Sequence, residues 1–181
     1  NTLNTLIMKK IILSVLVAAS SFGMLSLHAQ TAPKPKPSPA AEVSAVLANG
    51  TALSIKYSQP SLKGRTPGKD IEPMMGKVWR AGANDATVFE TSKDIKVNGQ
   101  LLPAGKYAFF TLQNEKGTTL IFNKTWKQWG AFQYKEADDA LRIMVNQTVA
   151  QESSEKLEYS ISNKGKVALR WGTINIEFTV E

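Results

Sequence analysis

The chain has 181 residues, no cysteine and one histidine, and its 22 lysines and arginines against 15 aspartates and glutamates give a formal net charge of +7. Without cysteine there is no disulfide, no cysteine nucleophile and no cysteine-ligated zinc site. The basic residues are scattered rather than gathered in a stripe, so we expect no nucleic-acid partner.

Residues 8–29 have the pattern of a secretory signal peptide. Lys9 and Lys10 follow Met8, and an apolar run then leads to the small residue Ala29. The run is too short to span a bilayer comfortably, so we expect cleavage after Ala29 and no membrane insertion afterwards. The product is expected in the periplasm or outside the cell. It is not a lipoprotein, because no cysteine is present to carry the lipid.

Signal cleavage would also change the chemistry of the chain. It removes His28, the only histidine, together with two lysines, which leaves 20 basic residues against 15 acidic ones and a net charge of +5. A chain without histidine and cysteine excludes a Ser-His-Asp triad. We expect no cofactor, no metal site and no catalytic residue set.

Residues 30–41 are expected to form an extended linker. Pro33, Pro35, Pro37 and Pro39 alternate with lysine and serine, a composition typical of solvated spacers. The remaining residues, 42–181, are long enough for a single domain with its own core.

From Glu42 onward the sequence predicts short strands separated by turns. Asn49-Gly50 and Asn98-Gly99 are hairpin signals, because both residue types tolerate a positive φ. Alternation of apolar and polar residues is cleanest at the end of the chain. A short helix is predicted only at 134–141. The predicted strands cover 43–48, 52–57, 95–97, 101–102, 106–112, 118–123, 157–161, 167–171 and 174–180. This pattern predicts an all-β, antiparallel, jelly-roll-like β-sandwich, with an open barrel as the alternative.

Three connections after strands carry the side chains best suited to binding. The first connection, 57–65, supplies Lys63 and Arg65. The second, 79–87, places a Trp, an Arg, an Asn and an Asp among small residues. The third is rich in aromatic residues. Because loops at one end of a sandwich converge, we expect them to share a site. The candidate ligand-binding residues are Lys63, Arg65, Trp79, Arg80, Asn84, Asp85, Trp126, Trp129 and Tyr134.

Two interpretations of these residues stay open. In the first, Trp126, Trp129 and Tyr134 present flat faces to a sugar or another small ligand, and the cations supply hydrogen bonds. In the second, the tryptophans close the end of the sandwich, and Arg80 pairs with an acid such as Asp85, Asp138 or Asp139.

Several blocks of sequence resemble an exported bacterial family catalogued as domain of unknown function number twenty-nine eleven. The matching stretches are 57–65, 76–84, 103–107, Asn123-Lys124 with Trp129-Gly130 and Tyr134, and 141–142, in the same order as in the family. The resemblance implies an exported, β-rich domain and supplies no activity. Residues 66–70 depart from the family pattern.

We therefore expect a non-catalytic exported domain that binds a small envelope or extracellular ligand, with a glycan as one option. Two alternatives are an enzyme that uses only carboxylates and basic side chains, and a structural module that docks an envelope protein.

Overall fold

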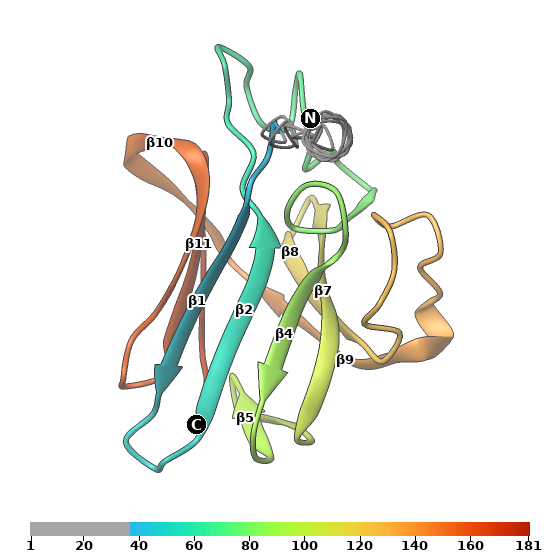
Figure 1. Ribbon diagram of the computed structural model, residues 1–181. Coiled ribbons are helices and arrows are strands. Elements are labelled where there is room, and N and C mark those ends of the chain that lie inside the picture. The colour runs from blue at the N-terminus through green and yellow to red at the C-terminus, as the bar shows by residue number, and fades with distance from the viewer. Residues whose placement is uncertain (1–36) are drawn as a thin grey trace, which may run out of the picture. The chain divides into compact units, whose positions relative to one another are not determined.

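The computed structural model describes residues 37–181 and confirms the predicted all-β antiparallel sandwich (Figure 1). The predicted signal peptide and residues 30–36 of the predicted linker lie outside the described residues. The elements are β1 (Ala40–Val46), β2 (Ala52–Ser58), β3 (Val78–Trp79), β4 (Thr87–Thr91), β5 (Ile95–Val97), β6 (Gln100–Leu102), β7 (Gly105–Asn114), β8 (Gly117–Asn123), the 3₁₀ turn η1 (Glu136–Asp138), β9 (Asp139–Val145), β10 (Gln147–Ile161) and β11 (Lys166–Thr179).

The first layer is a seven-stranded sheet in the order β1-β2-β4-β7-β8-β9, with β3 paired to β7. The predicted hairpins at Asn49-Gly50 and Asn98-Gly99 are confirmed. Asn98, with φ 44°, and Gly99, with φ 83°, both adopt the left-handed conformation that this turn requires. Strands β7 and β8 also form a hairpin, and their pairing extends to Asn114 and Gly117.

The second layer consists of the long hairpin β10–β11 and the short hairpin β5–β6. The two hairpins are joined end to end, since Lys96 N donates to Glu181 O at 2.8 Å and Asn98 N donates to Thr179 O at 2.9 Å. The inward face of β11 is apolar at alternate positions, as the sequence pattern predicts.

The core lies between these two layers. Four phenylalanines at its centre make edge-to-face and tilted contacts. The ring centroid of Phe122 lies 5.1 Å from that of Phe89, 5.3 Å from that of Phe109 and 6.3 Å from that of Phe178. Each ring is almost completely buried, and burying a side chain of this size contributes about 2–3 kcal/mol. The core therefore holds the domain without disulfides.

A second apolar cluster lies on the outer face of the large sheet. Phe110 and Ile121 project away from the main core and are covered by Ala131 and Tyr134, which belong to the connection between β8 and η1. The Phe110 and Tyr134 rings pack edge to face with centroids 5.2 Å apart. This connection is therefore fixed on the sheet rather than projecting from it.

Two local expectations were wrong. Ala40 and Ala41, assigned to the linker, pair with Ser58 and Tyr57 in the sheet, because pairing with β2 overrides the spacer-like composition around them. The helix predicted at 134–141 is limited to η1, because the residues from Asp139 onward pair with the open edge of β8. No helix within residues 37–181 is long and apolar enough to cross a membrane.

Candidate functional site

An open cavity of about 440 Å³ lies where β2 ends and β3 leads toward β4, and we call it the Arg80 cavity. Its walls come from the loop 59–77, the segment 79–83 and one residue of β11. This end of the sandwich is uppermost in Figure 1. The residues that matter for its chemistry are Arg65, Asp70, Glu72, Trp79, Arg80 and Trp171.

The backbone beside Arg80 is held in an unusual conformation. Ala81 has a φ of 50°, which is rare for a residue with a Cβ and costs free energy. Its carbonyl oxygen accepts two hydrogen bonds, from Tyr159 Oη at 2.6 Å and from Thr87 Oγ1 at 3.0 Å. These buried bonds from β10 and β4 fix the direction in which the Arg80 side chain leaves the chain.

Arg80 has no acidic partner in the part of the chain that the structure describes. Its Nε is buried and makes no hydrogen bond, and no carboxylate within residues 37–181 lies within ion-pair distance of its guanidinium. The expected pairing with Asp85, Asp138 or Asp139 is therefore not found. A buried N–H of a charged group without a partner is costly, so Arg80 is suited to receive an anionic group from a ligand.

The loop 59–77 forms the opposite wall. It is attached to β10, since Leu62 N donates to Glu155 O at 2.8 Å and Leu157 N donates to Pro60 O at 3.0 Å. It also packs against β11, where a Cβ on Gly172 would lie 3.0 Å from the Pro67 ring. The stretch 66–70 thus belongs to the loop that shapes the cavity.

Three polar side chains of this loop line the cavity while also bracing the loop. Arg65 donates to the carbonyl oxygens of Leu62 at 2.9 Å and Ser61 at 3.0 Å. Asp70 accepts from Thr66 N at 2.8 Å, and Glu72 accepts from Met74 N at 2.6 Å. Each carboxylate uses one oxygen in a turn and keeps further acceptor capacity.

The tryptophans in the cavity are core residues. Trp79 is 4% exposed and Trp171 is 1% exposed. Their indole nitrogens donate to backbone carbonyls, at 3.2 Å to Gly82 O and at 2.9 Å to Glu72 O. They line the cavity and offer no open stacking face.

The third connection, residues 123–134, contacts the second connection, residues 79–87, directly. Gly130 N donates to Asn84 O at 3.1 Å, and Asp85 and Trp129 form an isolated β-bridge. A Cβ added to Gly130 would lie 2.9 Å from Arg80 Nη1. The predicted convergence of these two connections is therefore present, and it occurs at the Arg80 guanidinium. Trp129, in the bridge to Asp85, is 56% exposed, whereas Trp126 is 40% exposed and lies under Lys106, whose Nζ is 5.4 Å from its ring centroid.

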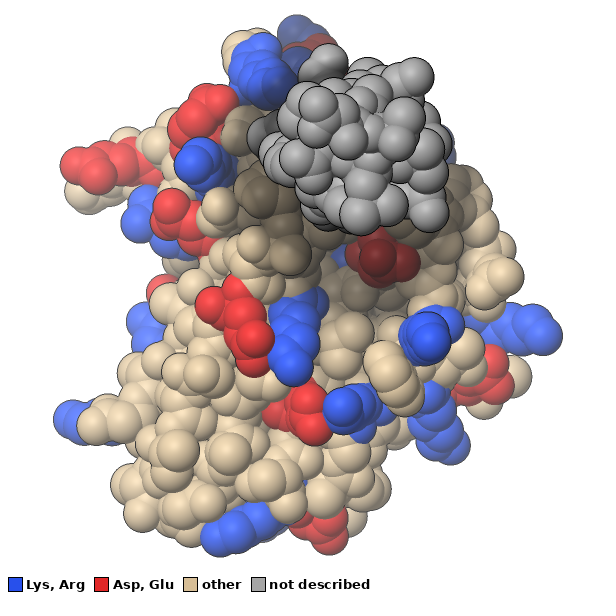
Figure 2. Space-filling view, viewed as in Figure 1, with Lys and Arg blue, Asp and Glu red and all other residues tan. Residues whose placement is uncertain are grey.

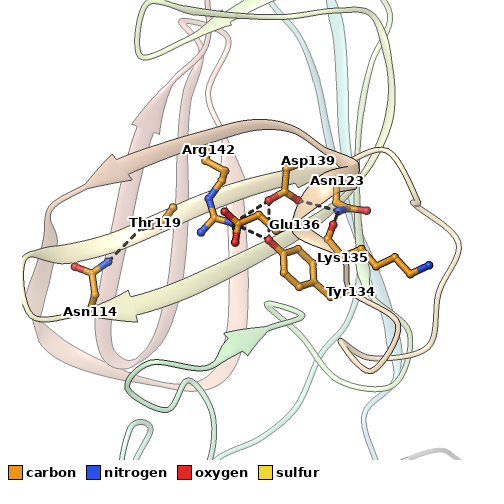
Figure 3. A network of polar contacts seen from close by, with 8 residues as sticks. All are labelled: Asn114, Thr119, Asn123, Tyr134, Lys135, Glu136, Asp139 and Arg142. Atoms are coloured by element: carbon orange, nitrogen blue, oxygen red, sulfur yellow. Dashed lines mark hydrogen bonds and ion pairs between the residues drawn. The ribbon is translucent and has the colours of Figure 1, made fainter.

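Tyr134 belongs to a separate polar network, shown in Figure 3. Its hydroxyl donates to Asp139 Oδ2 at 2.6 Å and accepts from Arg142 Nη1 at 2.7 Å. Burial raises the pKa of the Tyr134 hydroxyl well above its usual value, and the bond to Asp139 and its charge raise it further. The network also includes Asn123, and it secures the aromatic connection to β8 and β9.

The remaining candidates lie at the margin of the site. Lys63 is exposed and does not line the cavity. Asn84 donates from its amide to Ser38 O at 3.2 Å, and Asp85 is exposed. Sequence reasoning missed Asp70, Glu72 and Trp171 as cavity residues. The position of Trp171 in an alternating strand indicated only that it packs in the core.

Charge does not concentrate on the face seen in Figure 2, where lysines and arginines alternate with acids. On the large sheet, the ion pairs Lys56–Glu42 at 3.7 Å and Lys106–Glu90 at 3.5 Å join oppositely charged side chains of neighbouring strands. Another shallow hollow of about 410 Å³ over β1 and β2 is lined mainly by small residues and contains no cation. Within residues 37–181, no three acidic side chains gather in an arrangement suited to a metal ion.

The comparisons with known proteins agree with the resemblance seen in the sequence. Neither a curated protein nor a solved structure matches the chain. The family model described as a protein of unknown function (DUF2911) matches residues 38–180, which includes every strand and every wall of the Arg80 cavity. The chain belongs to this family.

Proposed function

We propose that this protein is a non-catalytic binding domain that holds a small ligand with an anionic group in the Arg80 cavity. One observation carries the proposal: Arg80 lines an open cavity, and its buried Nε has no hydrogen-bond partner within residues 37–181. A carboxylate or a similar anion fits the planar donor array of a guanidinium.

The surroundings of Arg80 favour a ligand that is polar as well as charged. Arg65 is a donor, and Asp70 and Glu72 are acceptors, on the same cavity wall. Hydroxyl groups both donate and accept, so a sugar acid would match these groups better than a simple fatty acid. The expected export of the chain would place this ligand in the periplasm or outside the cell.

The contacts of the two carboxylates favour binding over catalysis. Each already accepts a backbone N–H in the wall loop, which gives it a structural role there. An enzyme using carboxylates would need one of them positioned as an acid or base against a partner across the cavity. The alternative enzyme therefore receives less support than the binding domain.

The proposal is tested by titrating matched pairs of ligands that differ only in charge, such as glucuronate and glucose, with isothermal titration calorimetry. We expect glucuronate to bind more tightly than glucose, and Arg80→Gln to weaken glucuronate binding by roughly 10- to 100-fold, because a charged hydrogen bond is lost. Arg170→Gln is the control, since Arg170 lies on β11 and bonds Glu152 O instead. Equal binding by both ligands, or unchanged binding by folded Arg80→Gln protein, would refute the proposal.

A further inference from the structure

Arg80, which lines the cavity, also borders an exposed aromatic surface to which Trp129 and Phe132 belong. The position that a Cβ on Gly130 would occupy lies 2.9 Å from Arg80 Nη1 and 3.0 Å from Phe132 Cε2. The guanidinium and the phenyl ring therefore flank the same glycine, and no side chain separates them. Arg80 thus has the cavity on one side and the aromatic connection on the other.

This aromatic surface is unusually apolar for an exposed loop. Trp126, Trp129 and Phe132 are 40%, 56% and 82% exposed and lie within seven residues of one another. Elsewhere in residues 37–181, large exposed apolar side chains are dispersed over separate strands and loops. Exposed aromatic side chains beside a cavity are typical of a binding surface.

The surface is held rigidly enough to be preorganised. Ala86 N donates to Gln128 O at 3.0 Å, and Gly130 N donates to Asn84 O at 3.1 Å. Below the surface, Ala131 and Tyr134 are anchored on the outer face of the sheet. The aromatic rings are therefore presented from a fixed backbone, which lowers the entropy lost when a ligand binds.

The charges around the Arg80 cavity and the aromatic surface restrict the kinds of ligand that can bind. Asp70 and Glu72 line the cavity beside the two arginines, and Asp85 is exposed next to Trp129. These three acids disfavour a polyanion such as a nucleotide or a polyphosphate. They do accept hydrogen bonds from hydroxyl groups, so a ligand with one charge and many hydroxyls fits.

We infer that the ligand is a short acidic saccharide whose acidic unit occupies the Arg80 cavity and whose next, neutral unit stacks on Phe132 and Trp129. This inference rests on the proposed function and extends it to a substrate class and to a second subsite. The apolar ring face of a sugar matches an aromatic side chain, while its hydroxyls reach Asp85 and the loop backbone.

Chain length tests the second subsite. Calorimetric titrations use glucuronic acid, an aldotriouronic acid with one terminal uronic unit and two xylose units, and the neutral xylotriose. We expect the acidic trisaccharide to bind about tenfold more tightly than glucuronic acid, because a further apolar ring face is buried. We expect xylotriose to bind far more weakly than the acidic trisaccharide.

Variants then separate the two subsites. Phe132→Ala and Trp129→Ala should each reduce binding of the acidic trisaccharide toward that of glucuronic acid and leave glucuronic acid binding unchanged. Leu101→Ala, which removes another exposed apolar side chain (60%), is the matched control and should change neither. Arg80→Gln should weaken both acidic ligands.

The outcomes distinguish the inference from the function on which it rests. If glucuronic acid binding depends on Arg80 but chain length, Phe132 and Trp129 have no effect, the second subsite is refuted and the proposed function stands. If no acidic saccharide binds, the inference and the proposed function are both refuted. If acidic saccharides bind independently of Arg80, both are refuted.

Discussion

Replacing Asp139 by alanine should destabilise the domain more than any other change in the polar network of Figure 3. The Asp139 side chain is 5% exposed and accepts hydrogen bonds from Tyr134 Oη at 2.6 Å, Asn123 Nδ2 at 2.8 Å and Arg142 Nη1 at 2.9 Å. Its removal leaves three donors facing a space that had held a carboxylate.

The magnitude follows from how each donor can recover. Asn123 is completely buried; its Nδ2 keeps only the bond to Lys135 O at 3.0 Å, so one of its two N–H donors is left unpaired. Arg142 is 29% exposed and retains Glu136 at 3.5 Å, so water and that acid compensate part of its loss. Breaking a fully buried pair costs about 3–5 kcal/mol, and the partial exposure of Arg142 lowers our expectation to about 2–4 kcal/mol.

Urea unfolding followed by tryptophan fluorescence measures this loss, with the slope of the transition checked for constancy. Glu136→Ala is the matched control: that side chain is 74% exposed, so the ion pair it makes should contribute less than about 0.5 kcal/mol. If Asp139→Ala and Glu136→Ala unfold at the same urea concentration, the network does not hold the aromatic connection to the sheet.

Two further predictions concern tyrosine hydroxyls. Tyr159→Phe removes the hydrogen bond to Ala81 O at 2.6 Å and should lower the free energy of unfolding in urea by about 1–2 kcal/mol. Because that bond orients Arg80, the substitution should also weaken glucuronate binding. A variant that keeps both its stability and its glucuronate affinity would show that the left-handed conformation of Ala81 does not depend on this bond. Burial raises the pKa of both Tyr159 and Tyr134. Because the unfolded chain loses these protons near pH 10 while the folded chain keeps them, stability should be full below about pH 10 and should fall as the pH rises above it. Thermal melts between about pH 8 and about pH 11.5 check this, and an equal slope in Tyr134→Phe would remove that residue from the explanation.

Much of the scaffold can be predicted from the sequence because its signals are local. Asn49-Gly50 and Asn98-Gly99 specify turns through their own backbone preferences, and the strands beside them follow from alternation. The short strands β3 and β4 and the edge strand β9 carry weaker local patterns. β9 forms because β8 offers an unpaired edge, which is a property of the folded sheet rather than of residues 139–145.

The candidate site is less predictable because it depends on contacts between distant residues. The sequence indicates that Arg80 lies in a special segment, but not that Tyr159 clamps the carbonyl next to it from 78 residues away. It also does not show that Gly130 leaves room for the Arg80 guanidinium. Conversely, Lys63 has the composition of a site residue and lies outside the cavity, because the chain turns before its side chain can enter.

The central claim is that the Arg80 guanidinium receives an anion, and its Nε–H resonance reports on this most directly. In ¹H–¹⁵N spectra, with the signal assigned by its loss in Arg80→Lys, titration with glucuronate should shift the Arg80 Nε–H resonance along a saturable curve and leave that of Arg170 in place. An Arg80 resonance that stays fixed up to saturating glucuronate, or that moves no more than the Arg170 resonance, would contradict the account.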